Sequence, residues 1–427
     1  MEARNNELYI GGVGVGSLRE KFGTPLYIID EESFKEKVQI FIDNFKSDKF
    51  ETRVIYASKA FTNLYMVNLV AELGLYLDVV SGGELYTALK GGMASERIYY
   101  HGNNKLYDEL EFAISDAVGT IVVDNEYEYR LISKIANRDQ VRISILLRVN
   151  PGIEAKTHKY IQTAKHDSKF GMSIFNEKTK ELIEKMNADK CIDFRGIHCH
   201  IGSQIFDEKF FFAAAQAMIQ FAYDIETKLN LDIKEINLGG GFGVYYTEKD
   251  EPFNLPEFLQ KYIRLIEEKL SALAFNVEII SIEPGRSLIN NAGSTIYTIG
   301  GIKETITGLQ YLFVDGGMTD NPRHALYQAA YEAGIANKIN DELVQEYTVS
   351  GKLCETGDIL IKNVMLPEAS PGDILVIPST GSYNYSMSSN YNGMKKPAVV
   401  FVKNGECQLA VKRESYDDLI RNDVARK

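Results

Sequence analysis

The sequence predicts an α/β protein made of a closed (β/α)8 barrel of the TIM type and a mostly β domain. Between residues 53 and 285, eight short β-branched runs alternate with amphipathic helical segments. Strict alternation of this length is typical of a closed parallel barrel rather than an open sheet. After residue 285 the alternation stops and strand-like runs dominate. We therefore expect a barrel at 31–285 and a β-rich domain formed by 1–30 and 286–427.

The predicted barrel elements follow in order along the chain. The helical pattern 63–74 ends at Gly74, and another helix begins near Gly83. The apolar stretch 210–223 is too short to span a bilayer and predicts a buried helix. The connection at about 150–175 is long and polar, which favours a functional lid or binding loop. The eight expected strands are 53–59, 75–81, 97–102, 120–125, 141–150, 194–202, 233–241 and 277–285.

The β-rich domain is expected to combine both ends of the chain. The run "TPLYIID" at 24–30 precedes the barrel, and we expect it to pair into this domain. "KNGE" at 403–406 is a hairpin turn signal. The strand-like runs after the barrel are 294–302, 309–317, 346–354, 372–380 and 397–413.

Composition and charge exclude several classes of protein. The chain has 427 residues, 45% of them hydrophobic, and a formal net charge of −12. Nucleic acid is therefore not an expected partner, because duplex binding needs a basic face. The first residues lack the apolar core of a signal peptide. Four cysteines without a CxxC pair fit a reducing compartment. We expect a cytoplasmic protein with no membrane association.

Polar residues cluster at the expected carboxyl ends of the barrel strands, where such barrels build their active sites. Chance would scatter them over both ends, so this clustering predicts a catalytic barrel mouth. The residues concerned are Lys59, Asp78, Ser81, His101, Asp124, Arg148, Asn150, His198, His200, the glycine-rich 239–243 and the "EPGR" of 283–286.

Two of these features have two interpretations each. Lys59 is either a solvated lysine at a strand exit or a partly desolvated amine suited to form a Schiff base. The "LGGGFG" at 238–243 is either a tight turn or a cradle whose backbone N–H groups bind an anion. Its place on the seventh strand differs from the nucleotide-binding fingerprint, which lies near the start of a βαβ unit.

The histidines and Glu283 leave similar alternatives. His198 and His200 would point the same way. They are either a pair of metal ligands, or one ring turns into the barrel and packs as a flat aromatic plate. A metal is disfavoured because no third ligand has a recognisable spacing. Glu283 would pair either with a cationic ring nitrogen or with Arg286. An amine, an anion cradle, a flat ring and a carboxylate together suit pyridoxal 5'-phosphate.

Over nearly its full length the sequence resembles the diaminopimelate decarboxylase family. The matching motifs are "YASKA", "DVVSGGEL", "HGNNK", "HCHIGSQ", "GGGFG", "EPGRS", "VDGGMTDNPRHALY", "CETGD" and "SYNYSMSSNYN", in that order. Two departures are visible: Phe61 stands where many members have Asn, and His324 where Pro is frequent. Neither departure touches a residue to which the resemblance assigns a chemical role.

The resemblance implies roles residue by residue. Lys59 is similar to the lysine that holds the cofactor, His200 to the histidine that stacks on its ring, and Cys354 to the catalytic cysteine. These three are the expected catalytic residues. The expected cofactor contacts are Lys59, Asp78, His200, Ser203, Gly239, Gly240, Gly241, Glu283, Pro284, Gly285, Arg286 and Tyr383. The expected substrate contacts are Arg286, Arg323, Tyr327, Glu355 and Tyr383.

The chemistry of these residues favours decarboxylation of a diamino diacid. A carboxylate at Glu283 favours a protonated pyridine, which is the better electron sink. Cys354, otherwise a small core filler, would be the general acid that protonates Cα. Arg286 and Arg323 would clamp a distal carboxylate and Glu355 an ammonium. The expected reaction converts meso-diaminopimelate to L-lysine and CO2. The resemblance further implies a homodimer in which each site receives Cys354 from the partner subunit.

Three other functions remain open. A protein of this fold could decarboxylate ornithine, arginine or a carboxylated polyamine. A pyridoxal-phosphate-binding regulator without turnover would lack a use for Lys59, Cys354 and Glu283 together. A metal-dependent hydrolase would use His198 and His200.

Overall fold

The computed structural model describes residues 1–153 and 168–426, which form two compact units. One unit, here called the barrel unit, comprises 37–243 and 251–287. The other, here called the β unit, comprises 1–36, 244–250 and 288–427. Most of the loop that the sequence places at 150–175 lies outside the described residues.

The barrel unit contains eight parallel strands that close on themselves. Neighbouring strands pair in parallel in the order in which they occur, and the last pairs with the first through Ile279 and Glu51. The predicted barrel is thus confirmed. A two-residue strand outside the ring, β10 (Met172–Ser173), pairs in parallel with β9. The barrel strands are β5 (Glu51–Ala57), β6 (Tyr76–Val79), β7 (Ile98–Tyr100), β8 (Thr120–Val123), β9 (Ile143–Asn150), β11 (Ile192–His198), β12 (Glu235–Asn237) and β13 (Ile279–Ile282).

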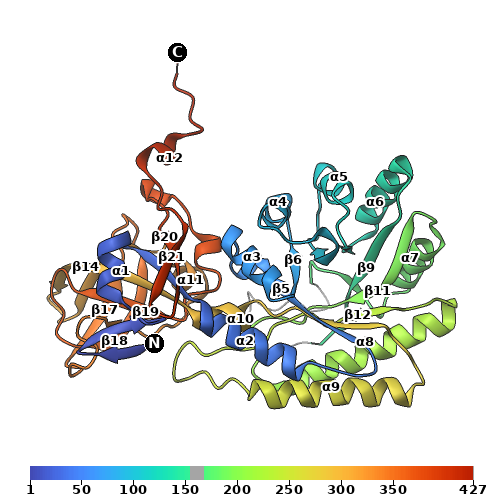
Figure 1. Cartoon of the computed structure of the whole chain (residues 1–427), viewed down its shortest axis with the longest axis horizontal. Helices are drawn as coiled ribbons and strands as arrows, with labels where there is room; N and C mark the ends of the chain where they lie inside the picture. Colours follow the sequence, from blue (N-terminus) through green and yellow to red (C-terminus); the bar gives the residue numbers. More distant parts are fainter. Residues whose placement is uncertain (154–167, 427) are drawn as a thin grey trace. The chain divides into compact units, whose positions relative to one another are not determined.

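Helices cover the outside of the barrel strands (Figure 1). Their starts are set by capping side chains that directly follow the strands: Asn63, Ser81 and Asn125 each accept a hydrogen bond from the backbone N–H three residues on. The helices are α3 (Leu64–Glu72), α4 (Gly82–Lys90), α5 (Tyr107–Ser115), α6 (Glu126–Asp139), α7 (Glu177–Ala188), α8 (Glu208–Leu229) and α9 (Leu255–Ala272).

The apolar stretch 210–223 lies within α8. The buried residues of this helix recur at helical spacing and form one apolar face, which includes Phe211, Ala215, Met218 and Ala222. None of the helices in the described ranges has the length and apolarity needed to cross a membrane.

The β unit is built on a sheet in which the N-terminal strand β4 (Leu26–Asp30) lies between two C-terminal strands. It pairs antiparallel with β14 (Gly293–Glu304) and parallel with β20 (Ala398–Lys403), as the sequence predicted. The hairpin from β20 to β21 (Glu406–Val411) turns at Asn404 and Gly405, both with positive φ. The remaining strands are β15 (Gln310–Val314), β16 (Gly334–Ile335), β17 (Gln345–Ser350), β18 (Ile359–Leu366) and β19 (Ile374–Pro378).

Several parts of the β unit were not expected from the sequence, among them the short strand β16 and the helix α1 (Val15–Phe22). Residues 2–14 form a small antiparallel sheet of β1 (Glu2–Arg4), β2 (Glu7–Ile10) and β3 (Val13–Gly14). Its residues Leu8 and Ile10 join a buried apolar cluster with β4 and β20. The strand β18 pairs with β17 through a ladder with bulges.

Candidate active site

Glu283 is the centre of a buried polar cluster in the barrel unit. It directly follows β13 and is 7% exposed. Nε2 of His198, the last residue of β11, lies 3.0 Å from its Oε2. Nε2 of His101, which follows β7, lies 3.0 Å from its Oε1, and Nδ2 of Asn237 donates to the same oxygen at 2.8 Å. Three strand ends therefore fix one carboxylate.

The electrostatics keep this carboxylate charged. Burial alone would raise the pKa of Glu283, but the facing imidazoles of His101 and His198 outweigh burial and hold its pKa well below the usual value. Burial lowers the pKa of His198 to about 4, although Glu283 opposes this shift. At neutral pH the arrangement is an anionic carboxylate that accepts a hydrogen bond from a neutral imidazole.

At the end of β11, His200 and His198 have different hydrogen-bond partners. The backbone N–H of Gly240 donates to Nδ1 of His200 at 3.2 Å. Burial, with Lys59 and Arg148 nearby, holds the pKa of His200 well below its usual value. The ring is therefore neutral at neutral pH, with Nδ1 as an acceptor.

The metal-pair interpretation of His198 and His200 has little geometric support. The ligand atoms that do converge, within 4.8 Å of one another, belong to His101, His198 and Glu283. Nδ1 of His198 has no hydrogen-bond partner in the described part of the chain. A metal-ligating histidine almost always anchors its second nitrogen. This cluster is better explained as support for the carboxylate.

Close packing explains the glycine run after β12. A Cβ on Gly240 would lie 2.0 Å from the carbonyl oxygen of Glu283, and one on Gly239 2.2 Å from that of Cys199. Gly239 and Gly241 also adopt positive φ, at 67° and 114°. Only glycine lets the backbone pass so close to the neighbouring strand ends. The N–H of Gly239 donates to Oδ1 of Asn237 at 2.9 Å, and that of Gly240 donates to His200.

Lys59 lies in a 3-10 turn, Ser58–Ala60, directly after β5, and is half-buried. The preceding Ser58 donates to Oε2 of Glu84 at 2.9 Å, and the same oxygen accepts the backbone N–H of Val80 at 2.8 Å. The turn that carries Lys59 is thereby tied to the loop after β6.

The other predicted cofactor residues of this unit lie at the same strand ends. Asp78 is buried near the end of β6, and burial raises its pKa; its Oδ1 has no partner among the described residues. Nε and Nη2 of Arg286 donate to Oγ of Ser203 at 3.3 and 3.2 Å. Pro284 and Gly285 join Glu283 to Arg286, and a Cβ on Gly285 would lie 2.9 Å from that of Ala57.

These residues fit pyridoxal phosphate. The amine of Lys59 and the held anion of Glu283 match its aldehyde and its ring nitrogen. The glycine run has no side chains that would keep a phosphate away from its backbone, and the unpartnered Oδ1 of Asp78 is available to a polar group of a ligand.

In the β unit, Arg323 begins α11 (Arg323–Tyr327) and is buried among tyrosines. Its guanidinium carbon lies 5.4, 5.6 and 5.9 Å from the ring centres of Tyr246, Tyr327 and Tyr383. Aromatic faces stabilise a cation without neutralising it. Nε of Arg323 has no hydrogen-bond partner in the described ranges, so the guanidinium keeps a donor for a carboxylate.

Cys354 lies in the turn between β17 and β18 and is exposed, as is the adjacent Glu355. The core-filler interpretation is wrong for this cysteine. Cys199 is the contrasting case, because it is buried and burial raises the pKa of its thiol to about 12.

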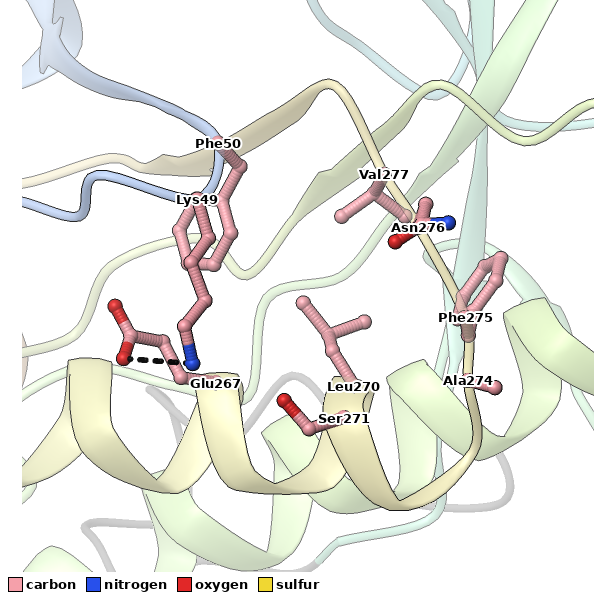
Figure 2. A pocket seen from close by; sticks show the side chains of 9 residues that line it. All are labelled: Lys49, Phe50, Glu267, Leu270, Ser271, Ala274, Phe275, Asn276 and Val277. Carbon is pink, nitrogen blue, oxygen red and sulfur yellow. Dashed lines mark ion pairs between the residues drawn. The ribbon is translucent and has the colours of Figure 1, made fainter.

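A pocket of about 90 Å³ lies at the other end of the barrel (Figure 2). Phe50 and Val277 precede their strands, so the pocket opens at the amino ends. Lys49 and Glu267 form an ion pair there, with N and O 3.4 Å apart. The remaining lining residues are Leu270, Ser271, Ala274, Phe275 and Asn276, and none is a predicted site residue.

Comparison with known proteins agrees with the geometry. Residues 31–290 match the family model for the pyridoxal-binding domain of pyridoxal-dependent decarboxylases. The diaminopimelate decarboxylase of Bacillus subtilis (strain 168) is 47% identical over 421 residues, covering 99% of this chain and 96% of that protein. The chain belongs to the diaminopimelate decarboxylase family.

Other members of the diaminopimelate decarboxylase family match equally completely. The Staphylococcus aureus (strain COL) protein is 42% identical, covering 99% of this chain and 98% of that protein. The crystal structure of the diaminopimelate decarboxylase from M. jannaschii superposes with a TM-score of 0.93 at 32% identity, covering 100% of this chain and 98% of that one. The predicted family, the pyridoxal phosphate dependence and the carboxy-lyase class are confirmed.

Proposed function

We propose that this protein decarboxylates meso-diaminopimelate to L-lysine and CO2, the last step of lysine biosynthesis. The observation that carries the proposal is the buried Glu283 anion, held by His101, His198 and Asn237. Such an anion would keep a pyridine nitrogen protonated. Two related structures, from M. jannaschii and Helicobacter pylori, are diaminopimelate decarboxylases in complex with L-lysine, at 31% and 30% identity. L-lysine is the product of the proposed reaction.

The barrel unit holds the cofactor in this proposal. Lys59 would hold its aldehyde carbon through Nζ, and Ser203 with the glycine run 239–241 would hold its phosphate. The neutral ring of His200 would lie against its ring. When bound, pyridoxal phosphate supplies the electron sink that loss of a carboxylate from an amino acid requires. Glu283 keeps the ring nitrogen protonated, and an arginine at that position would not.

The β unit supplies substrate recognition. Arg323 offers its unpartnered Nε to the distal carboxylate of the substrate, and Tyr327 and Tyr383 surround the guanidinium. Glu355 binds the distal ammonium. Arg286, which belongs to the barrel unit, is the second arginine expected to bind the carboxylate. Ornithine has a distal ammonium but no distal carboxylate, and a buried arginine without its anion costs several kcal/mol in order of magnitude. Selectivity for the diacid follows.

Cys354 then donates its thiol proton to Cα after CO2 has left, which completes the amino acid product. We propose that the protein acts as a homodimer in which Cys354 serves the cofactor bound by the other subunit. Its four free cysteines, one of them a required thiol, suit the reducing cytoplasm.

A substrate panel tests the proposal. Purified protein with added pyridoxal phosphate is incubated with meso-diaminopimelate, ornithine, arginine and a carboxylated polyamine, and CO2 and lysine are measured. We expect CO2 and lysine in equal amounts from meso-diaminopimelate alone. Turnover of ornithine without lysine formation from the diacid would refute the assignment, and cofactor binding without any turnover would favour the regulator.

A further inference from the structure

The turn that carries Cys354 is held at three successive backbone N–H groups. The N–H of Lys352 donates to the carbonyl of Gly316 at 3.1 Å, and that of Leu353 to Oδ2 of Asp358 at 2.9 Å. The N–H of Cys354 donates to Oδ1 of Asn392 at 2.9 Å. Each bond joins the turn to a different partner, although Cys354 itself is exposed.

Asp358 joins two of the chain segments. Its Oδ1 accepts the N–H of Met318 at 2.6 Å while Oδ2 holds Leu353. Its backbone oxygen accepts the N–H of Gly351 at 3.0 Å. A Cβ on Gly317 or Gly351 would lie 2.5 or 2.2 Å from a carboxylate oxygen of Asp358. These contacts explain why "VDGGMTD" and "SGKLCETGD" contain glycine beside the carboxylate.

Asn392 contributes the third tie from the segment "SSNYN". It adopts the left-handed conformation with φ 53°, which asparagine and glycine tolerate best. The same segment is bound to the 316–321 turn, because the N–H of Ser389 donates to the carbonyl of Thr319 at 2.9 Å. The segments 316–321, 351–358 and 389–393 thus brace one another, and we call this arrangement the Cys354 clamp.

We propose that Asn392 and Asp358 are positioning residues that fix the direction in which Cys354 presents its thiol. The inference rests on the proposed role of Cys354 as proton donor. The hydrogen bond on the backbone N–H of Cys354 restricts rotation of the backbone at this residue. Proton transfer requires a donor in a defined position. An exposed turn without such ties would sample many orientations.

Asn392 offers a matched pair of variants. Asn392→Gly keeps the positive φ and removes the acceptor, whereas Asn392→Asp keeps both the backbone conformation and the acceptor oxygen. In the holoenzyme with meso-diaminopimelate, we expect Asn392→Gly to lower kcat about tenfold or more with KM nearly unchanged, since misplaced groups cost up to about a hundredfold. Asn392→Asp is expected to retain kcat within about threefold at its own pH optimum, because the acceptor remains.

A second readout does not depend on turnover. The rate at which iodoacetamide alkylates Cys354 is followed against pH by peptide mass spectrometry. Asn392→Gly should raise that rate about threefold or more, because a loosened turn opens more often. Asn392→Asp should move the alkylation profile to higher pH, since a carboxylate beside the turn disfavours the thiolate. Such a displacement would show that the side chain at 392 lies beside the thiol, whereas the alkylation rate of Asn392→Gly tests its hold on the turn.

Three results decide the matter. Unchanged kcat and alkylation in Asn392→Gly would overturn the clamp. Should that variant fail to fold, a tenfold or larger loss of kcat in Asn392→Asp would overturn it instead, because that variant keeps the acceptor oxygen. Normal turnover of Cys354→Ala would refute the proton-donor role alone, while the alkylation measurements would still test whether the clamp positions the thiol.

Discussion

Nε2 of His198 lies 3.0 Å from Oε2 of Glu283, and both side chains are buried. The carboxylate therefore has one orientation and a stable charge. Glu283→Gln removes the charge while keeping the shape. We expect kcat to fall by about a hundredfold, the loss typical of removing one preorganised electrostatic group, while cofactor binding persists. Glu267→Gln, at the opposite end of the barrel, is the control and should leave steady-state rates unchanged.

Lys59→Ala should abolish covalent attachment of the cofactor. We expect borohydride reduction of the holoenzyme to label the peptide that contains Lys59 and to label nothing in the variant, with turnover lost as well. The exposed Lys49 is the matched control, since Lys49→Ala should retain both label and activity. A label on any other lysine would contradict the assignment.

Cys354→Ala should separate cofactor binding from proton delivery. The visible absorbance of the bound cofactor is expected to persist, while kcat falls by roughly a hundredfold or more, as for loss of a general acid. The half-buried Cys407 provides the comparison, and Cys407→Ala should behave as the parent. Equal rates in both variants would exclude the thiol as the proton donor.

Lys105 and Glu128 form an ion pair that is 1% exposed on each side, with N and O 3.1 Å apart. Nζ of Lys105 also donates to the carbonyls of Gly102 and Val122. Lys105→Met leaves a buried carboxylate without its cation, so we expect a loss of about 3–5 kcal/mol in the free energy of unfolding.

The double variant Lys105→Met/Glu128→Gln removes both charges and should recover part of that loss. Denaturant titration measures both variants. A double variant less stable than the single would mean that the lost charge is not the cause.

Asp320 should make the protein less stable as pH rises. Burial raises its pKa from 3.8 to about 7, although Tyr297 donates to it at 2.6 Å and opposes the shift. The folded state therefore binds more protons than the unfolded state between these values, so stability falls as pH rises through this window. The loss is at most about 4 kcal/mol, from about 1.4 kcal/mol per pKa unit.

Asp320→Asn removes this titration. Thermal unfolding measured from pH 4 to pH 8 should decline less steeply for the variant than for the parent. Parallel curves would exclude Asp320 as the titrating group.

The barrel could be predicted because the alternation of strands and helices follows from short stretches of sequence. Every expected barrel strand overlaps an observed one. The strand β18 was missed because Lys362 and Asn363 interrupt its apolar pattern, and Asn363 has a positive φ of 55°. The sheet of residues 2–14 was missed because its strands are two to four residues long.

Some residues of the candidate site could be predicted from the sequence, and others could not. Lys59 and Glu283 were recognisable because each ends an apolar strand. Asn237 was not, although it too ends a strand, because its bond to Glu283 depends on how β12 and β13 are aligned. The N–H of Cys354 is bound by Asn392, 38 positions away, and that of Leu353 by Asp358, 5 positions away. A side chain that accepts such an N–H leaves no periodic signal in the sequence.

Because β4 lies between β14 and β20, the order of synthesis has a consequence for folding. During translation the strand at 26–30 emerges almost four hundred residues before β20 at 398–403. Until then one edge of this apolar segment is open, and such an edge can recruit a strand from another chain. A ribosome stalled before residue 398 would thus release a product prone to aggregate.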